Sequence, residues 1–189
     1  MIRTFIAVEV SPEVRRRAAE WIRVLQARAI EARWVDPTQM HLTLQFLGQV
    51  PEIQLPHICK AIGNAVASAS PFDVVCTELG VFPDWKRPRV LWLGIGEGYE
   101  QLVELQQRVE RALQPLGYRG EARRFEPHVT LGRLRRSDPI PEALRQDVQR
   151  TMQNKGQVGF DVSEVVVFSS QLSRQGPRYE AIGRAELLG

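Results

Sequence analysis

The sequence predicts an α+β fold in which two antiparallel sheets face a central cleft, with helices on the outside. Segments with strand and helix patterns follow one another in nearly the same order in the two halves of the chain. The order of these segments fits antiparallel sheets better than regular βαβ winding. No stretch is long enough to act as a linker between the halves, so we expect residues 1–189 to form a single bilobal domain.

The first half begins with residues 3–10, which alternate in the manner of a strand. Ser11 and Pro12 supply an N-cap and a proline at the first helical position, and apolar residues recur at helical spacing from Val14 onward. In chain order, this half is predicted to contain a strand at 3–10, a helix at 12–31, an extended piece at 33–35, a strand at 40–48, a helix at 55–69 and strands at 72–80 and 88–96.

The second half repeats this order. Leu102, Leu105 and Val109 are spaced as on a helix, and Pro127 marks the entry to a strand. The predicted elements are a helix at 98–115, a strand at 127–134, a helix at 140–153 and strands at 158–169 and 178–187. The chain is therefore expected to be a duplicated unit of two lobes.

Composition places the chain among ordinary globular proteins, with 43% hydrophobic and 25% charged residues. No apolar run approaches the ~20 residues of a membrane span. The first segment carries Glu9 too early for a signal sequence, so we expect a cytoplasmic protein with no membrane attachment. Cys59 and Cys76 have neither metal-site nor redox spacing, which favours a reducing compartment.

Arginine dominates the basic residues. Only Lys60, Lys86 and Lys155 are lysines among 25 basic residues, and the sequence pI is about 9.2 although the net charge is only +3. The guanidinium group suits phosphate and also stacks on bases, so this bias is compatible with an RNA or nucleotide partner but does not require one. The sequence does not rank the arginines that could line such a path, namely Arg3, Arg33, Arg87, Arg89 and Arg124.

Two of the three histidines begin the same four-residue motif, His-x-Thr-Leu, in His41-Leu42-Thr43-Leu44 and His128-Val129-Thr130-Leu131. On a strand, residues two apart point to the same face, so each motif presents an imidazole beside a hydroxyl. Continued alternation in the first strand predicts that Gln45 joins the histidine face, whereas Phe46 joins the two leucines on the opposite, apolar face.

Two imidazoles on facing lobes suit in-line displacement at phosphorus, because one can accept a proton from water while the other gives one to the departing oxygen. Thr43 and Thr130 can donate hydrogen bonds to phosphate oxygens, and Arg133 can add positive charge if the second strand extends that far. This design requires no metal and no cofactor. The spacing identifies the pair of histidines but leaves open which is the acid and which is the base.

These residues resemble a known family. Paired His-x-Thr-x motifs are the signature of the 2H phosphoesterase superfamily, and the wider pattern resembles its bacterial and archaeal RNA 2′,3′-cyclic phosphodiesterases, also called 2′-5′ RNA ligases. The resemblance extends from residue 3 to about residue 134. It is carried by Arg3-x-Phe5-Ile6-Ala7, His41-Leu42-Thr43-Leu44-x-Phe46-Leu47-Gly48, Phe82-Pro83, Arg87-Pro88-Arg89-Val90-Leu91-Trp92 and Phe125-x-Pro127-His128-Val129-Thr130-Leu131-Gly132-Arg133.

The resemblance implies hydrolysis of a terminal RNA 2′,3′-cyclic phosphate to a 2′-phosphomonoester, with His41 as proton donor and His128 as proton acceptor. Reverse 2′-5′ ligation is allowed through the same transition state. We expect a monomer whose partner is RNA with a cyclic phosphate end. Two alternatives stay open: action of the same site on a small cyclic nucleotide or a sugar cyclic phosphate, and RNA binding without turnover.

Overall fold

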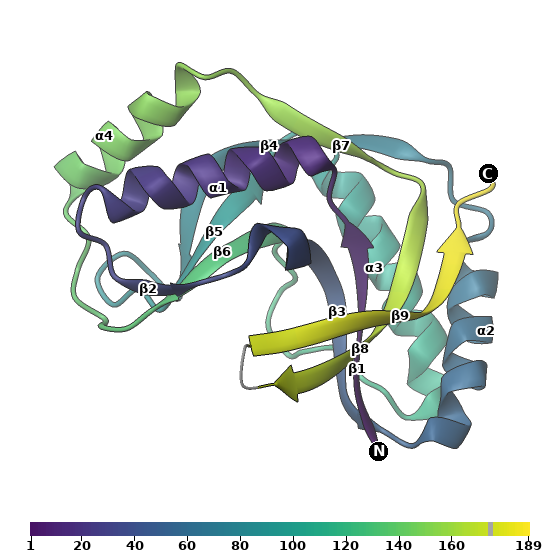
Figure 1. The fold of residues 1–189 in the computed structure, drawn as a ribbon. Coiled ribbons are helices and arrows are strands. Elements are labelled where there is room, and N and C mark those ends of the chain that lie inside the picture. The colour runs from purple at the N-terminus through teal and green to yellow at the C-terminus, as the bar shows by residue number, and fades with distance from the viewer. Residues whose placement is uncertain (174–175) are drawn as a thin grey trace.

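Two antiparallel sheets make up the centre of the protein in a computed structural model that describes residues 1–173 and 176–189 (Figure 1). Sheet A, in spatial order, contains β3 (His41–Val50), β1 (Ile2–Glu9), β8 (Glu164–Ser173) and β9 (Gly176–Glu186). Sheet B contains β2 (Ala32–Trp34), β6 (His128–Leu134), β5 (Val90–Ile95), β4 (Phe72–Phe82) and β7 (Val158–Val162). Neighbouring strands in both sheets are antiparallel, as the predicted α+β class requires.

Four α-helices of the described residues cover the outer faces of the sheets (Figure 1). They are α1 (Pro12–Gln26), α2 (Leu55–Val66), α3 (Tyr99–Leu113) and α4 (Glu142–Gln153). Helices α2 and α3 pack on sheet A, whereas α1 packs on β7 of sheet B and contacts α4. Burial of apolar side chains such as Ile6, Leu42 and Leu131 between helices and sheets supplies the main driving force for folding. The predicted fold class is therefore confirmed.

Helix α1 begins where the sequence predicts and ends earlier. The Ser11 hydroxyl accepts a hydrogen bond from the Val14 N–H at 3.2 Å, and Pro12 occupies the first turn. The helix stops at Gln26 rather than near residue 31, because the chain reverses through Ala29, whose φ is 57°. The Ile30 N–H then bonds back to the Leu25 carbonyl at 3.2 Å and closes the helix end.

The strand predicted at 158–169 is two strands in different sheets. Its first part, β7, pairs with β4 in sheet B, and its second part, β8, pairs with β1 and β9 in sheet A. Apolar residues recur on both sides of the polar pair Ser163 and Glu164, so the sequence indicates extended chain but does not show that the strand changes its pairing partner there. Which strand pairs with which is decided by contacts far apart in the sequence.

The two halves of the chain exchange strands. Strands β4 and β5, which follow the first motif strand, lie in the sheet of the second motif strand, β6. In return, β8 and β9, from the second half, lie in the sheet of β3. Each lobe is therefore assembled from both halves of the chain. None of the helices found in residues 1–173 and 176–189 combines the length and the apolar character needed to cross a membrane.

Candidate active site

The two motif strands meet where the sheets adjoin, because β3 of sheet A and β6 of sheet B are in contact. His41 and Thr43 on β3, and His128 and Thr130 on β6, are half-buried, whereas the residues between them are fully buried. We call the faces that carry the histidines the inner faces of the sheets. Burial is the main cause that lowers the pKa of His41, and the charge of His128 also lowers it, so the two imidazoles are near enough to interact electrostatically.

Both imidazoles are held in the same way. The Nδ1 of His41 lies 2.8 Å from the Gln39 carbonyl oxygen, and the Nδ1 of His128 lies 2.7 Å from the Glu126 carbonyl oxygen. A carbonyl can only accept a hydrogen bond, so Nδ1 must carry the proton in each neutral ring. This tautomer leaves Nε2 as the nitrogen that takes a proton from substrate or, when protonated, gives one.

A β-bulge changes which side chains of β3 share the histidine face. Ala7 pairs with Thr43, but the next residue back, Ile6, pairs with Gln45, so Leu44 is an extra residue. The bulge turns Gln45 into the core, where it is 5% exposed, and turns Phe46 to the inner face, where it is 52% exposed. The predicted faces of Gln45 and Phe46 were therefore wrong, because one inserted residue inverts the alternation that follows it.

The second motif strand carries the same bulge at the same place. Trp92 pairs with Thr130 and Leu91 pairs with Gly132, so Leu131 is the extra residue. Arg133 is thereby brought to the inner face of sheet B, beside His128 and Thr130. It also lies directly opposite Arg33 on β2. Like charges opposed on neighbouring strands repel, so this pair favours a bound anion.

Aromatic rings support each imidazole from its own sheet. The ring centroid of His41 lies 4.8 Å from that of Phe5 and 5.1 Å from that of Tyr179. The ring centroid of His128 lies 4.9 Å from that of Phe82 and 5.7 Å from that of Trp92. Phe5, Phe82 and Trp92 lie in segments that carry the family resemblance, and Tyr179 does not. None of the four was predicted as a site residue, because each comes from a different strand from the histidine that it contacts.

One glycine makes room for the aromatic support of His128. A Cβ atom at Gly80 would lie 2.2 Å from the Trp92 ring, a distance that no real contact permits. Glycine at this position therefore lets the indole lie against β4 while it packs beside the imidazole.

Burial is the first cause that lowers the pKa of both His41 and His128 below the ordinary histidine value. Hydrogen bonds from Nδ1 to the carbonyls act in the opposite direction. Nearby charges also contribute. Glu9 raises the pKa of His41 and Arg15 lowers it. Glu126 raises the pKa of His128, whereas Arg123 and Arg133 lower it. Arg15 and Arg123 come from a helix and a loop, so the strand motifs did not indicate them.

The arginines that the sequence could not rank fall into two groups. Arg3 lies on β1 and Arg33 lies on β2, both exposed on strands of the two sheets. Arg87, Arg89 and Arg124 are exposed in loops. Within the described part of the chain, no group of three or more His, Cys, Asp or Glu side chains is arranged to hold a metal ion.

The sequence profile of the 2′-5′ RNA ligase superfamily matches residues 11–174. The chain belongs to this superfamily. A protein of Aquifex aeolicus named RNA 2′,3′-cyclic phosphodiesterase is 34% identical over 186 residues, which cover 96% of this chain and 95% of that protein. A protein of Thermotoga maritima with the same name is 32% identical over 188 residues, which cover 100% of this chain and 97% of the relative.

Solved structures share the fold of this superfamily member. A crystal structure of a Thermus thermophilus protein superposes with a TM-score of 0.78 at 27% identity and covers 100% of this chain and 99% of its own. The apo form of LigT from E. coli superposes with a TM-score of 0.75 at 22% identity and covers 100% and 98% of the two chains. At that identity the second comparison bears on the fold alone.

Proposed function

We propose that this protein is a metal-independent RNA 2′,3′-cyclic phosphodiesterase that converts a terminal 2′,3′-cyclic phosphate to a 2′-phosphomonoester. The observation that carries the proposal is the matched pair His41 and His128, each with Nδ1 engaged by a carbonyl and Nε2 left for proton transfer. The names of the full-length relatives support it. The family resemblance assigns His41 as the proton donor and His128 as the proton acceptor.

The reaction needs one proton taken and one given. Neutral His128 accepts a proton through Nε2 from a water molecule, whose oxygen attacks the phosphorus. The bond between phosphorus and the 3′ oxygen breaks, and protonated His41 gives its Nε2 proton to that oxygen. The product carries a 2′-phosphate and a free 3′-hydroxyl. Solvent then returns the two histidines to their starting protonation states.

The remaining inner-face groups act on the phosphate. The hydroxyls of Thr43 and Thr130 make no hydrogen bond with the part of the chain that the structure describes, so both are available to the non-bridging oxygens. Arg133 supplies positive charge to the same group. With these side chains providing both proton transfer and charge, no step assigns work to a metal ion.

The deciding assay uses an RNA that ends in a 2′,3′-cyclic phosphate, incubated with the purified protein in the presence of EDTA. We expect a 2′-phosphomonoester as the only new end, identified by its resistance to a 3′-specific phosphatase. Formation of a 3′-phosphate would contradict the assigned leaving oxygen. Loss of turnover in EDTA would contradict metal independence.

The same site allows 2′-5′ ligation when the 5′-hydroxyl of a second RNA takes the place of water: its oxygen bonds to phosphorus as His128 accepts its proton, and the 3′ oxygen leaves with the proton of His41. We also propose that the protein acts as a monomer, because one chain supplies both histidines. A concentration-independent specific activity would support this assignment, and activity that disappears on dilution would contradict it.

A further inference from the structure

We propose that Glu126 and Tyr99 form a pair of positioning residues that prepares His128 to act as the base. This inference rests on the proposed function and assigns a role to two residues outside the strand motifs. Glu126 precedes the second motif by two residues, and Tyr99 is the first residue of α3, 27 positions before Glu126 in the chain. The Tyr99 hydroxyl donates a hydrogen bond to Glu126 Oε2 at 3.2 Å.

Glu126 acts on His128 through two different groups. Its backbone carbonyl oxygen lies 2.7 Å from Nδ1 and fixes the tautomer and the orientation of the ring. Burial lowers the pKa of His128, and the Glu126 carboxylate opposes this change by favouring the protonated ring. A base becomes positively charged when it takes a proton from water, so a nearby carboxylate stabilises the state that this step produces.

Tyr99 can hold this carboxylate because its phenol stays protonated. Burial raises the pKa of the Tyr99 phenol, and the charges of Glu126 and Glu100 raise it further, whereas the charge of Arg124 lowers it. The Tyr99 side chain is half-buried and packs against the apolar core at the start of α3. The carboxylate is therefore tied to a helix, although its own residue lies in the loop that leads into β6.

Two arginines act against the carboxylate. The charges of Arg123 and Arg133 disfavour the protonated form of His128. The guanidinium carbon of Arg123 lies 4.1 Å from the centroid of the Phe82 ring, and that ring meets the His128 ring edge-on at 4.9 Å. A carboxylate that is held in place offsets part of the effect of these cations on the imidazolium.

The first motif does not combine these two groups in one residue. The carbonyl that lies 2.8 Å from Nδ1 of His41 belongs to Gln39, whose side chain carries no charge. The pKa of His41 is lowered chiefly by burial, and the carboxylate that opposes this change, that of Glu9, is bonded to Arg184 at 2.8 Å. This difference favours His128 over His41 as the base.

The test measures the pH profile of kcat/KM for a cyclic-phosphate RNA. Glu126→Gln keeps the backbone carbonyl and removes the charge, so the pKa of His128 falls. A base must be neutral to act, and therefore the acidic limb should move to lower pH while the basic limb stays in place. We expect kcat at the optimum to fall roughly ten-fold with KM unchanged, because a weaker base takes the proton less readily.

Tyr99→Phe tests whether the phenol acts through the carboxylate. It should lower kcat about three-fold in the wild-type background and leave kcat unchanged when Glu126→Gln is already present, because two groups that act as a unit are not additive. Equal losses in the two backgrounds would show that the phenol is merely structural and would overturn the proposed pair.

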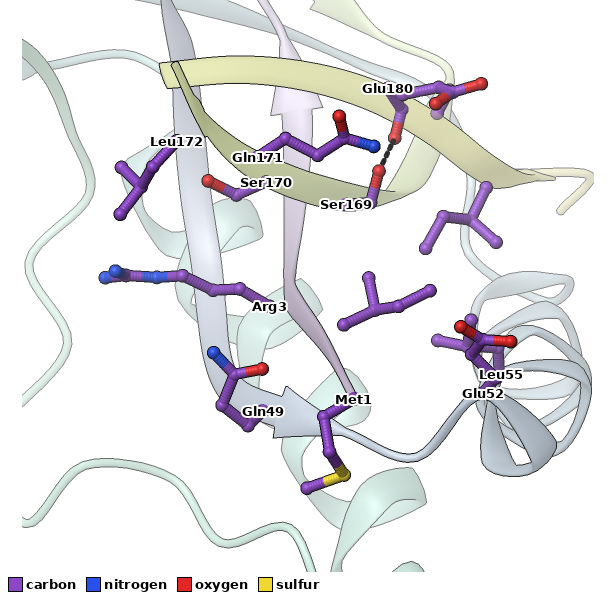
Figure 2. A pocket seen from close by; sticks show the side chains of 13 residues that line it. Met1, Arg3, Gln49, Glu52, Leu55, Ser169, Ser170, Gln171, Leu172 and Glu180 are labelled. Atoms are coloured by element: carbon purple, nitrogen blue, oxygen red, sulfur yellow. Dashed lines mark hydrogen bonds between the residues drawn. The ribbon is translucent and has the colours of Figure 1, made fainter. Parts of the chain in front are cut away.

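Two matched controls separate positioning from general destabilisation. Tyr118→Phe removes another phenol that donates to a side chain, here Gln54 Oε1. Gln54 lies between Glu52 and Leu55, which Figure 2 shows beside a cavity that neither histidine lines. Glu121→Gln neutralises an exposed carboxylate in the loop before β6. Both variants should keep the wild-type kcat and pH profile.

The remaining outcomes are distinct. An unmoved acidic limb in Glu126→Gln would overturn this inference and leave the proposed function standing. A shift of the basic limb instead would also overturn it, because His128 would then be the acid. Turnover of the cyclic-phosphate RNA by neither the variants nor the wild-type protein would overturn the proposed function itself.

Discussion

The motif strands β3 and β6 share their backbone geometry but differ in the charges around it. Both hold a histidine through a carbonyl two residues earlier, and both insert a bulge at the leucine that follows the threonine. Five residues beyond each histidine, the bulge turns one side chain inward. That side chain is Phe46 on β3 and Arg133 on β6. The repeat therefore creates two equivalent positions, and the side chains there make the lobes different.

The difference separates two tasks. The surface of sheet A next to His41 is aromatic, with Phe5 and Tyr179 in ring contact. Sheet B presents Arg133 opposite Arg33, near His128. The two histidines proposed to transfer protons therefore lie in unlike surroundings, aromatic beside His41 and cationic beside His128.

Replacing either histidine should lower kcat to a similar extent, because each motif strand contributes one of the two imidazoles. We expect His41→Ala and His128→Ala each to lower kcat by roughly 10²–10⁴-fold, because each supplies one proton transfer. Single-turnover cleavage of a cyclic-phosphate RNA measures the effect, with circular dichroism to verify the fold. His57→Ala is the control, since its Nδ1 contacts the Ile53 carbonyl on a distant helix. Near-normal turnover in either of the first two variants would refute two-histidine catalysis.

Variants of the two motif threonines test whether both lobes donate hydrogen bonds to the phosphate. Thr43→Val and Thr130→Val should each lower kcat by about 10²-fold, as loss of one preorganised donor does elsewhere. Thr38→Val serves as the control, because the Thr38 hydroxyl already donates to Asp36 at 2.8 Å. A large loss in only one of the two motif variants would show that a single lobe holds the phosphate.

A substitution at Gly80 tests whether the Trp92 ring positions His128, without changing any residue that contacts His41. Gly80→Ala should displace the Trp92 ring and lower kcat roughly ten-fold, since small misplacements of reacting groups are costly. Gly63→Ala, in a helix with nothing within 4 Å of the new Cβ, is the matched control and should raise the free energy of unfolding by about 1 kcal/mol. Unchanged kcat in Gly80→Ala would show that the indole does not position the imidazole.

The smallest expected effect is a shift in pH dependence. Burial lowers the pKa of both histidines, so the bell-shaped profile of kcat/KM should be centred below about pH 6.5. Arg133→Gln removes a cation that disfavours protonated His128, so the pKa of His128 rises. A base must be neutral to act, and therefore the acidic limb should move to higher pH. Arg89→Gln should leave both limbs in place, and a shift of the basic limb in Arg133→Gln would reverse the acid and base assignment.

Most elements could be predicted locally, because alternation and helical spacing report burial within a segment. The first strand and α1 begin within a residue of their predicted positions, and β2, β4 and β5 also lie where extended patterns occur. The faces of Gln45 and Phe46 could not be predicted. A bulge depends on how β3 pairs with β1, and the motif strand contains no sign of it.

The sequence by itself determined the pairing of imidazole with hydroxyl, because residues two apart on a strand share a face. It also determined the apolar positions that drive the sheets and helices together. Only the tertiary structure decided that the chain halves exchange strands, that two bulges turn Phe46 and Arg133 inward, and that Arg15 and Arg123 approach the histidines. These features depend on hydrogen bonds and charges between residues far apart in the chain, which local periodicity does not encode.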